Sequence, residues 1–324
     1  MLKHPSLGIL SPNFTRADLF LVVFCLVDDW MKQRYGSSNK PRKTHGPGHH
    51  EIADSEVITL LLVGQLCRCP REQAWLRQVR ANYGALFPHL PEDSRFWRRA
   101  QYVREQLRAL RQSILFWADA DLEPIRIFDS FPMPLCACYR IRQSSQPITG
   151  SAFAYNHSKR QYYFGLHPGL LMTGSGYVED IVLAPGWCMD TPLLAAYLDE
   201  CQQEGRDLSQ QDWFLDKGFF NGSLAERAHE QTGAHILARR RDYPKELREL
   251  DPPFWQQLID KVRKPIETMI ATLTEYFGLE HMLAHSDWGL YRRVQTIATA
   301  VALARYFNQA LDATDPMNFA QYAV

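Results

Sequence analysis

The sequence predicts an α/β domain that follows a helical N-terminal region. Up to about residue 120, apolar residues recur at the three- and four-residue spacing of helices that bury one face. From about residue 122, short β-type runs alternate with helical segments, an order that is typical of a sheet covered by helices. We therefore divide the 324 residues into a helical, partly basic region over 1–120 and an α/β region over 121–324.

The N-terminal region is expected to contain several helices. Thr15 precedes the first and is expected to cap it, because its hydroxyl can accept a free backbone N–H. The apolar run 19–27 lies within this helix and is too short to cross a bilayer, so we interpret it as core. The expected helices span 15–31, 55–67, 72–83 and 94–112.

In the α/β region, three β-type runs precede the first helix, and two more alternate with the helices that follow. This order predicts one sheet with helices on its faces, followed by C-terminal helices. The expected strands are 125–128, 161–166, 177–183, 212–215 and 234–238, and the expected helices are 190–203, 222–231, 255–277 and 291–310.

The charges are distributed unevenly along a chain whose net charge is zero. Residues 1–120 carry 17 Lys and Arg against 11 Asp and Glu, whereas residues 121–324 carry 19 against 25. A basic front half and an acidic back half fit a DNA-binding part joined to a metal-binding part. A chance distribution fits as well, and a neutral total is not typical of a dedicated nucleic-acid binder.

Two segments are strongly basic. The loop 36–50 contains Gly, Pro, Ser and basic residues and no acid, and 94–112 contains six arginines and one acid. Within the second segment, Arg104, Arg108 and Arg111 share one helical face. Each segment could contact DNA phosphates or be a solvated surface, and the sequence favours neither.

The seven cysteines are odd in number, which favours reduced thiols in a cytosol. Two C-x-C pairs occur, Cys67 with Cys69 and Cys136 with Cys138. Their spacing differs from the C-x₂₋₄-C of structural zinc sites, so buried apolar thiols are the favoured interpretation and a zinc-binding module is the alternative. We expect a cytoplasmic protein without a membrane segment.

Two acids stand at the ends of expected strands. Asp129 ends the run IRIFD, and Asp216 ends the run WFLD. Strand ends are where open α/β sheets place their chemistry, and a half-buried carboxylate there pairs with a cation or holds a metal. Glu267 lies on the expected helix 255–277, beside the apolar stripe of that helix, and could project towards the sheet.

Carboxylates from three separate elements suit Mg²⁺, which prefers oxygen ligands. Two such ions can activate an attacking oxygen and stabilise a leaving one, which is the chemistry of phosphodiester transfer. Taken singly, each acid could equally be a helix cap or an ion-pair partner. Asp190, for example, is expected to cap the helix that begins Thr191-Pro192.

At these residues the chain resembles the DDE transposases of bacterial insertion sequences. Among them it most resembles insertion-sequence family nine-eight-two. The likeness extends over most of the chain, and the order and spacing of its motifs are more specific than any one motif. The motifs are Phe128–Pro132, Tyr163–His167, Leu215–Phe219 and Pro265–Thr268, supported by Ser94–Arg99 and by Asp28 and Asp29 in the first helix.

The resemblance implies a ribonuclease H-like catalytic core in which Asp129, Asp216 and Glu267 form the triad and bind two Mg²⁺ or Mn²⁺ ions. It implies DNA cleavage at the terminal inverted repeats of the element, followed by transfer of the freed 3′-OH to target DNA. It further implies a homodimer on double-stranded DNA, in a bacterial cytoplasm and associated with the nucleoid.

The resemblance also implies a DNA contact for Arg263, four residues before Glu267. Many relatives have a tyrosine and a lysine where this chain has Asp260 and Thr274, so those two roles stay unassigned and an impaired copy is an alternative. Further candidates for DNA contact, each with a solvated surface as alternative, are Lys264, Lys217, Arg104, Arg108 and the run 239–241.

Two other functions fit the same motifs. One is a nuclease of the same fold that cuts DNA without joining it. The other is a transposase-derived DNA-binding protein without catalysis.

Overall fold

The computed structural model describes residues 3–10, 14–36, 52–69, 71–136, 148–156, 159–219, 221–239, 253–282, 284 and 286–323. The chain divides into two compact units, which we describe separately. One unit is Ala120–Asp287, and the other joins Met1–Asp119 with Trp288–Val324. The sequence-based division placed the C-terminal helix with the α/β region, whereas the structure groups it with the N-terminal helices.

The centre of the α/β unit is a five-stranded mixed sheet with the order β6-β5-β1-β7-β8. Strands β1, β7 and β8 are parallel to one another, while β5 is antiparallel to both β1 and β6. The strands are β1 (Ile125–Ser130), β5 (Gly169–Thr173), β6 (Val178–Val182), β7 (Asp212–Leu215) and β8 (His235–Ala238).

One expected strand belongs to a different sheet. Residues Gln161–Leu166 form β4 at the middle of a separate three-stranded sheet, between β2 (Met133–Cys136) and β3 (Ala152–Asn156). The second strand of the central sheet is β5, which the sequence analysis missed. Its five residues are all buried, so it lacks the alternation of a half-exposed strand and is too short to stand out.

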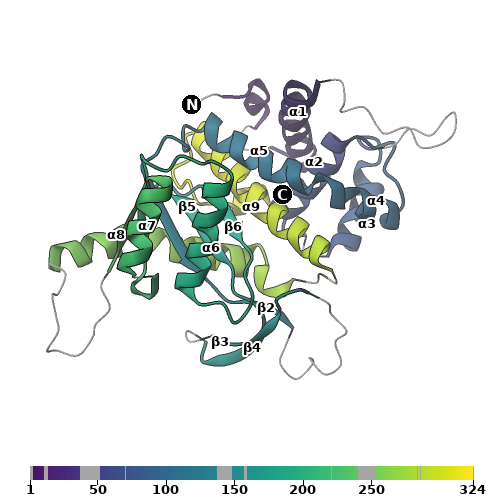
Figure 1. Ribbon diagram of the computed structural model, residues 1–324. Helices are drawn as coiled ribbons and strands as arrows, with labels where there is room; N and C mark the ends of the chain where they lie inside the picture. The colour runs from purple at the N-terminus through teal and green to yellow at the C-terminus, as the bar shows by residue number, and fades with distance from the viewer. Residues whose placement is uncertain are drawn as a thin grey trace, which may run out of the picture. The chain divides into compact units, whose positions relative to one another are not determined.

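Helices cover both faces of the central sheet. In Figure 1, α6 (Asp190–Gln203) and α7 (Gly222–Thr232) lie in front of it. Phe128 of β1 and Leu215 of β7 belong to the core on this side, together with Leu194, Tyr197, Leu198, Trp213, Leu224 and Ala228.

The third helix of this unit, α8 (Pro253–Ala271), packs against β1 and β7. Its buried stripe comprises Ile259, Arg263, Ile266 and Met269. The helix contains Pro265, which has no N–H to donate to the carbonyl of Lys261, so its hydrogen-bond ladder is broken within this segment.

The fold of this unit is the α/β class predicted from the sequence. The first acid lies on the first strand of the central sheet, the second follows the fourth strand in chain order, and Glu267 lies on the helix after the fifth. This order agrees with the ribonuclease H-like core that the resemblance implied.

The other unit is helical, as predicted. Thr15 caps α1 through a capping box, in which its hydroxyl accepts the Asp18 N–H and the Asp18 carboxylate accepts the Thr15 N–H. The helices are α1 (Arg16–Tyr35), α2 (Asp54–Leu66), α3 (Glu72–Tyr83), α4 (Asp93–Ala100), α5 (Arg104–Trp117) and α9 (Asp287–Ala310).

The arginine-rich segment differs from the single helix that we expected. It is split into α4 and α5 by a 3₁₀ turn over Gln101–Val103. Arg111 is fully buried and donates from Nη1 to Gln295 Oε1 on α9, at 2.6 Å. It is therefore a core residue, and the shared face of Arg104, Arg108 and Arg111 is not a uniform cationic surface.

Several sequence-based interpretations concern residues outside the described ranges. These are the basic loop beyond Gly36, Cys138, and the second and third arginines of 239–241. Six cysteines lie within the described ranges, and all six are free thiols. No helix in the described parts of the chain is long and apolar enough to cross a membrane.

Candidate active site

The register of the sheet brings two predicted site residues together. Phe128 of β1 pairs with Leu215 of the parallel strand β7, so Asp129 and Asp216 are the next residues on neighbouring strands. Neighbouring strands lie about 5 Å apart, and both of these strands end at the same edge of the sheet. The two carboxylates therefore stand side by side at that edge.

Both carboxylates face α8. Side chains alternate between the faces of a strand, and Phe128 and Leu215 lie in the core under α6 and α7. Asp129 and Asp216 consequently point to the opposite side, where they meet Arg263. The guanidinium donates from Nη2 to Asp129 Oδ2 at 2.7 Å and from Nη1 to Asp216 Oδ1 at 3.1 Å.

Arg263 is the cation of this site and is itself enclosed. Its side chain is only 9% exposed, and its Nε is buried without a hydrogen-bond partner among the described residues. Asp129 is the more enclosed of the two acids, at 18% side-chain exposure against 41% for Asp216. The site is thus a pair of partly buried acids that one guanidinium bridges.

The electrostatics of Asp129 show that one arginine does not fully compensate for burial. Burial raises the pKa of the Asp129 carboxyl to about 6, against the lowering effects of Arg263 and of the Ser130 N–H; the charge of Asp216 adds to the increase. The Ser130 N–H donates to Asp129 Oδ1 at 2.9 Å. Ionised Asp129 would therefore be stabilised by additional positive charge.

The third predicted acid does not join the pair. Glu267 lies one helical turn after Arg263 on α8, beside the buried Ile266, and is exposed. It forms no hydrogen bond or ion pair with any residue that the structure describes. Within the described ranges, no three His, Cys, Asp or Glu side chains are grouped closely enough to hold one metal ion.

Asp190 takes a different place from the expected one. The N-cap of α6 is Met189, which makes no side-chain capping bond, and Asp190 is the first residue of the helix. Its Oδ1 accepts a 2.6 Å hydrogen bond from Ser130 Oγ, next to Asp129. Sequence reasoning missed this contact. Ser130 is two residues after Phe128 on β1, and residues two apart on a strand share a face, so its side chain lies on the α6 side.

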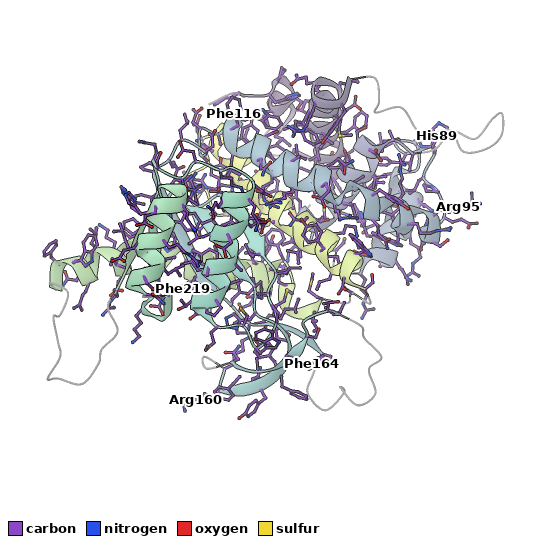
Figure 2. All side chains as sticks on the ribbon, in the orientation of Figure 1. His89, Arg95, Phe116, Arg160, Phe164 and Phe219 are labelled. Carbon is purple, nitrogen blue, oxygen red and sulfur yellow. The ribbon has the colours of Figure 1, made fainter. Side chains whose placement is uncertain are left out.

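The residues after Asp216 also reach α6. Thr191 Oγ1 donates to the Gly218 carbonyl at 3.3 Å, and the Phe219 N–H donates to the Asp216 carbonyl at 3.0 Å. Phe219, labelled in Figure 2, is buried with its ring edge-on to that of Phe128, at a centroid distance of 5.5 Å. The turn that follows the second acid is therefore anchored in the core.

The basic residues predicted to contact DNA lie in several environments. Lys217 and Lys264 are exposed, close in sequence to Asp216 and Arg263. Arg104 stacks on the Trp288 ring, 4.0 Å from its centroid, and also contacts Glu105. Arg108 is partly buried.

The two positions that depart from the family pattern have local partners. Asp260 Oδ1 and Oδ2 each accept a 3.0 Å hydrogen bond from Nη1 of Arg239. Thr274 is buried and donates to the carbonyls of Ile270 and Ala271. Both side chains are thus engaged within the protein.

Comparisons with known proteins were made for the whole chain. A search of curated protein sequences gives no match. Among solved structures, the chain is similar to one described as "Crystal structure of a pre-cleavage Mos1 transpososome", with 15% identity, 93% of each chain covered and a TM-score of 0.21. That TM-score is too low for the likeness to support any conclusion about this chain.

The family comparison is more informative. A family model described as "Transposase DDE domain" matches residues 121–303, which is more than half of the chain and includes the strands and helices that carry all three predicted acids. The chain belongs to the transposase DDE domain family.

Proposed function

We propose that this chain is a metal-dependent DNA transposase, which cuts DNA at the ends of its own element and joins the freed 3′ ends to target DNA. The observation that carries this proposal is the pair Asp129 and Asp216, adjacent on parallel strand ends and bridged by one buried cation. Membership of the family supports the same chemistry.

The residues of the site fit divalent ions. Asp129 and Asp216 offer only carboxylate oxygens, which suit Mg²⁺ or Mn²⁺, and the bridging guanidinium shows that one positive group can reach both acids. Burial raises the pKa of the Asp129 carboxyl, and bound cations would favour its ionised form. When bound, two such ions would activate the attacking oxygen and neutralise charge on the scissile phosphate.

Arg263 has two roles in this proposal. It pairs with both acids in the structure, and bound divalent ions would compete with it for their oxygens. A guanidinium freed from one acid could then donate to a phosphate of the DNA backbone, a group that arginine binds well. Glu267, one turn further along α8, would be the third ligand and would come from the same helix as Arg263.

The remaining proposed contacts concern DNA. Lys217 and Lys264 are exposed beside the acid pair and bind backbone phosphates as point charges. Arg104 and Arg108 provide further phosphate contacts from the helical unit. Two element ends require two active sites, so the chain acts as a homodimer on double-stranded DNA.

The test is cleavage of duplexes that carry the inverted repeats flanking the gene, with Mg²⁺ present. Asp216→Asn removes a proposed ligand and should lower the cleavage rate by about 10³-fold, since metal ions supply several kcal/mol of transition-state stabilisation. Asp212→Asn is the matched control. Asp212 lies on the same strand at its other end, with 46% side-chain exposure against 41% for Asp216.

The outcomes distinguish the possible functions. Equal cleavage by both variants would show that Asp216 is not in the active site. Labelled 3′ ends would show whether the cut DNA is joined to target DNA, and cleavage without joining would indicate a nuclease. If the parent binds DNA without Mg²⁺ and never cleaves it, the protein only binds DNA.

A further inference from the structure

We propose that Asp190, at the start of α6, is a positioning residue that holds the two acid-bearing strand ends in a fixed relative placement. The inference rests on the proposed function of Asp129 and Asp216. It assigns Asp190 a role in the same reaction without making it a metal ligand.

The first link runs through Ser130. Its hydroxyl donates to Asp190 Oδ1 at 2.6 Å, and its backbone N–H donates to Asp129 Oδ1 at 2.9 Å. The residue that orients the Asp129 carboxylate is therefore tied to the α6 terminus. A hydrogen bond to a carboxylate is stronger than a neutral one, so this link restrains the end of β1.

The second link runs through Gly218. A Cβ at this position would lie only 2.4 Å from Asp190 Oδ2, so the carboxylate packs directly against the glycine. The neighbouring Thr191 hydroxyl donates to the Gly218 carbonyl. Because Gly218 and Asp216 share one short turn, the α6 terminus also restrains the end of β7.

A third segment reaches the same carboxylate. His167, just before β5, has its Nε2 at 3.6 Å from Asp190 Oδ1, and this nitrogen is buried with no hydrogen-bond partner among the described residues. The strands β5, β1 and β7 are consecutive in the sheet. One carboxylate thus contacts residues that flank three neighbouring strands, all at the edge that carries the acids.

The geometry separates Asp190 from the ion site. Asp129 and Asp216 face α8 and Arg263, whereas Ser130 leaves β1 on the α6 side. Asp190 forms no three-acid group with the two aspartates. Its carboxylate is instead engaged by a hydroxyl and a glycine, which are contacts that fix backbone position.

The test compares Asp190→Ala and Asp190→Asn with Asp199→Ala, a control on the same helix whose exposed carboxylate pairs with Arg227. Mn²⁺ binding is measured by calorimetry without DNA, and cleavage gives kcat and KM. Asp190→Ala should weaken Mn²⁺ binding and lower kcat, each roughly 10- to 100-fold, with the number of bound ions and the KM for DNA unchanged. Asp190→Asn keeps an oxygen for Ser130 and should restore most of both.

A second variant reaches the same contact from the other side. Gly218→Ala should reproduce the defect of Asp190→Ala, because the added methyl displaces the carboxylate. In the variant that carries both substitutions, the smaller side chain at 190 leaves room for the methyl at 218. The effects of the two substitutions should therefore not add, and the departure from additivity measures the contact between Asp190 and Gly218. Because Gly218→Ala tests the contact without changing Asp190, it remains an independent test if Asp190→Ala is poorly folded.

Three results would overturn the inference. If Asp190→Ala behaves like Asp199→Ala in a parent that binds Mn²⁺ and cleaves DNA, Asp190 has no positioning role, although the proposed function stands. If Asp190→Asn is as impaired as Asp190→Ala and one ion fewer is bound, Asp190 is a ligand. A parent that neither binds Mn²⁺ nor cleaves DNA overturns the proposed function as well.

Discussion

The two sides of the acid-bearing sheet edge differ in how they hold the site. On the α8 side a single guanidinium meets Asp129 and Asp216, and the contacts are ionic. On the α6 side the contacts are hydrogen bonds and close packing around Asp190. They involve Ser130 and Gly218, which follow the two acids in the chain, rather than the acids themselves. The α8 side thus sets the charge of the site, and the α6 side sets its shape.

If this division is correct, added Mg²⁺ should relieve the stability losses caused by substitutions on the α8 side and not those caused by substitutions on the α6 side. The largest expected effect on stability is that of Arg263→Ala. Removing one partner of a buried ionic group costs about 3 kcal/mol, and here it leaves two adjacent acids without their cation. Millimolar Mg²⁺ should reduce the loss, since the ion binds the folded state only.

Denaturant unfolding with and without Mg²⁺ measures this effect. The control is Arg227→Ala, which removes an exposed pair with Asp199 at 3.4 Å and should change stability by at most about 0.5 kcal/mol. A loss for Arg263→Ala that is the same with and without Mg²⁺ would contradict a charge-setting role for the α8 side.

Asp129→Asn should have a smaller effect, in the stabilising direction. The pKa of Asp129 in the folded chain is raised from 3.8 to about 6, so folding favours its protonated form. The stability contributed by the protonated carboxyl is present below about pH 4 and is lost as the pH rises through about 6. The amide mimics the protonated form, and one pKa unit corresponds to about 1.4 kcal/mol, so the variant should be more stable by about 2 to 3 kcal/mol above that pH.

Thermal melts across this pH range would test the sign. The stabilisation should vanish towards pH 4, and added Mg²⁺ should favour the parent, because only the ionised carboxylate binds it. A variant that is less stable than the parent above pH 6 would mean that the ion pair with Arg263 outweighs the cost of burial.

Ser130→Ala should give the smallest change and the clearest contrast. It removes one hydroxyl that donates to Asp190, which costs about 1 kcal/mol. The loss should persist when Mg²⁺ is added, because no charge of the ion site is altered. A loss that Mg²⁺ abolishes would show that the two sides of the sheet edge are not separate.

The sequence predicted features that depend on local pattern. The α/β class, the cap at Thr15 and the helix over 72–83 follow from periodicity and from residue preferences at helix ends. The strand-end positions of Asp129 and Asp216 follow from the apolar runs that precede them. Each of these features is determined by residues close together in the chain.

Long-range partners could not be predicted in the same way. The residue pattern of 161–166 does not indicate which sheet this strand joins. The sequence around Arg111 likewise does not indicate whether its side chain faces solvent or contacts Gln295. The bridge from Arg263 to both acids joins residues 134 and 47 positions apart. Such contacts depend on how the elements pack, which periodicity does not encode.

The proline within α8 has a consequence for how the third acid is presented. Pro265 lies between Arg263 and Glu267, at the point where the helical hydrogen-bond ladder is broken. Ile266 and Met269, on the glutamate side of this break, are fully buried, so apolar packing holds that turn where the helical hydrogen bonding is interrupted. The direction in which the glutamate leaves the helix therefore depends on two apolar side chains that are themselves inert.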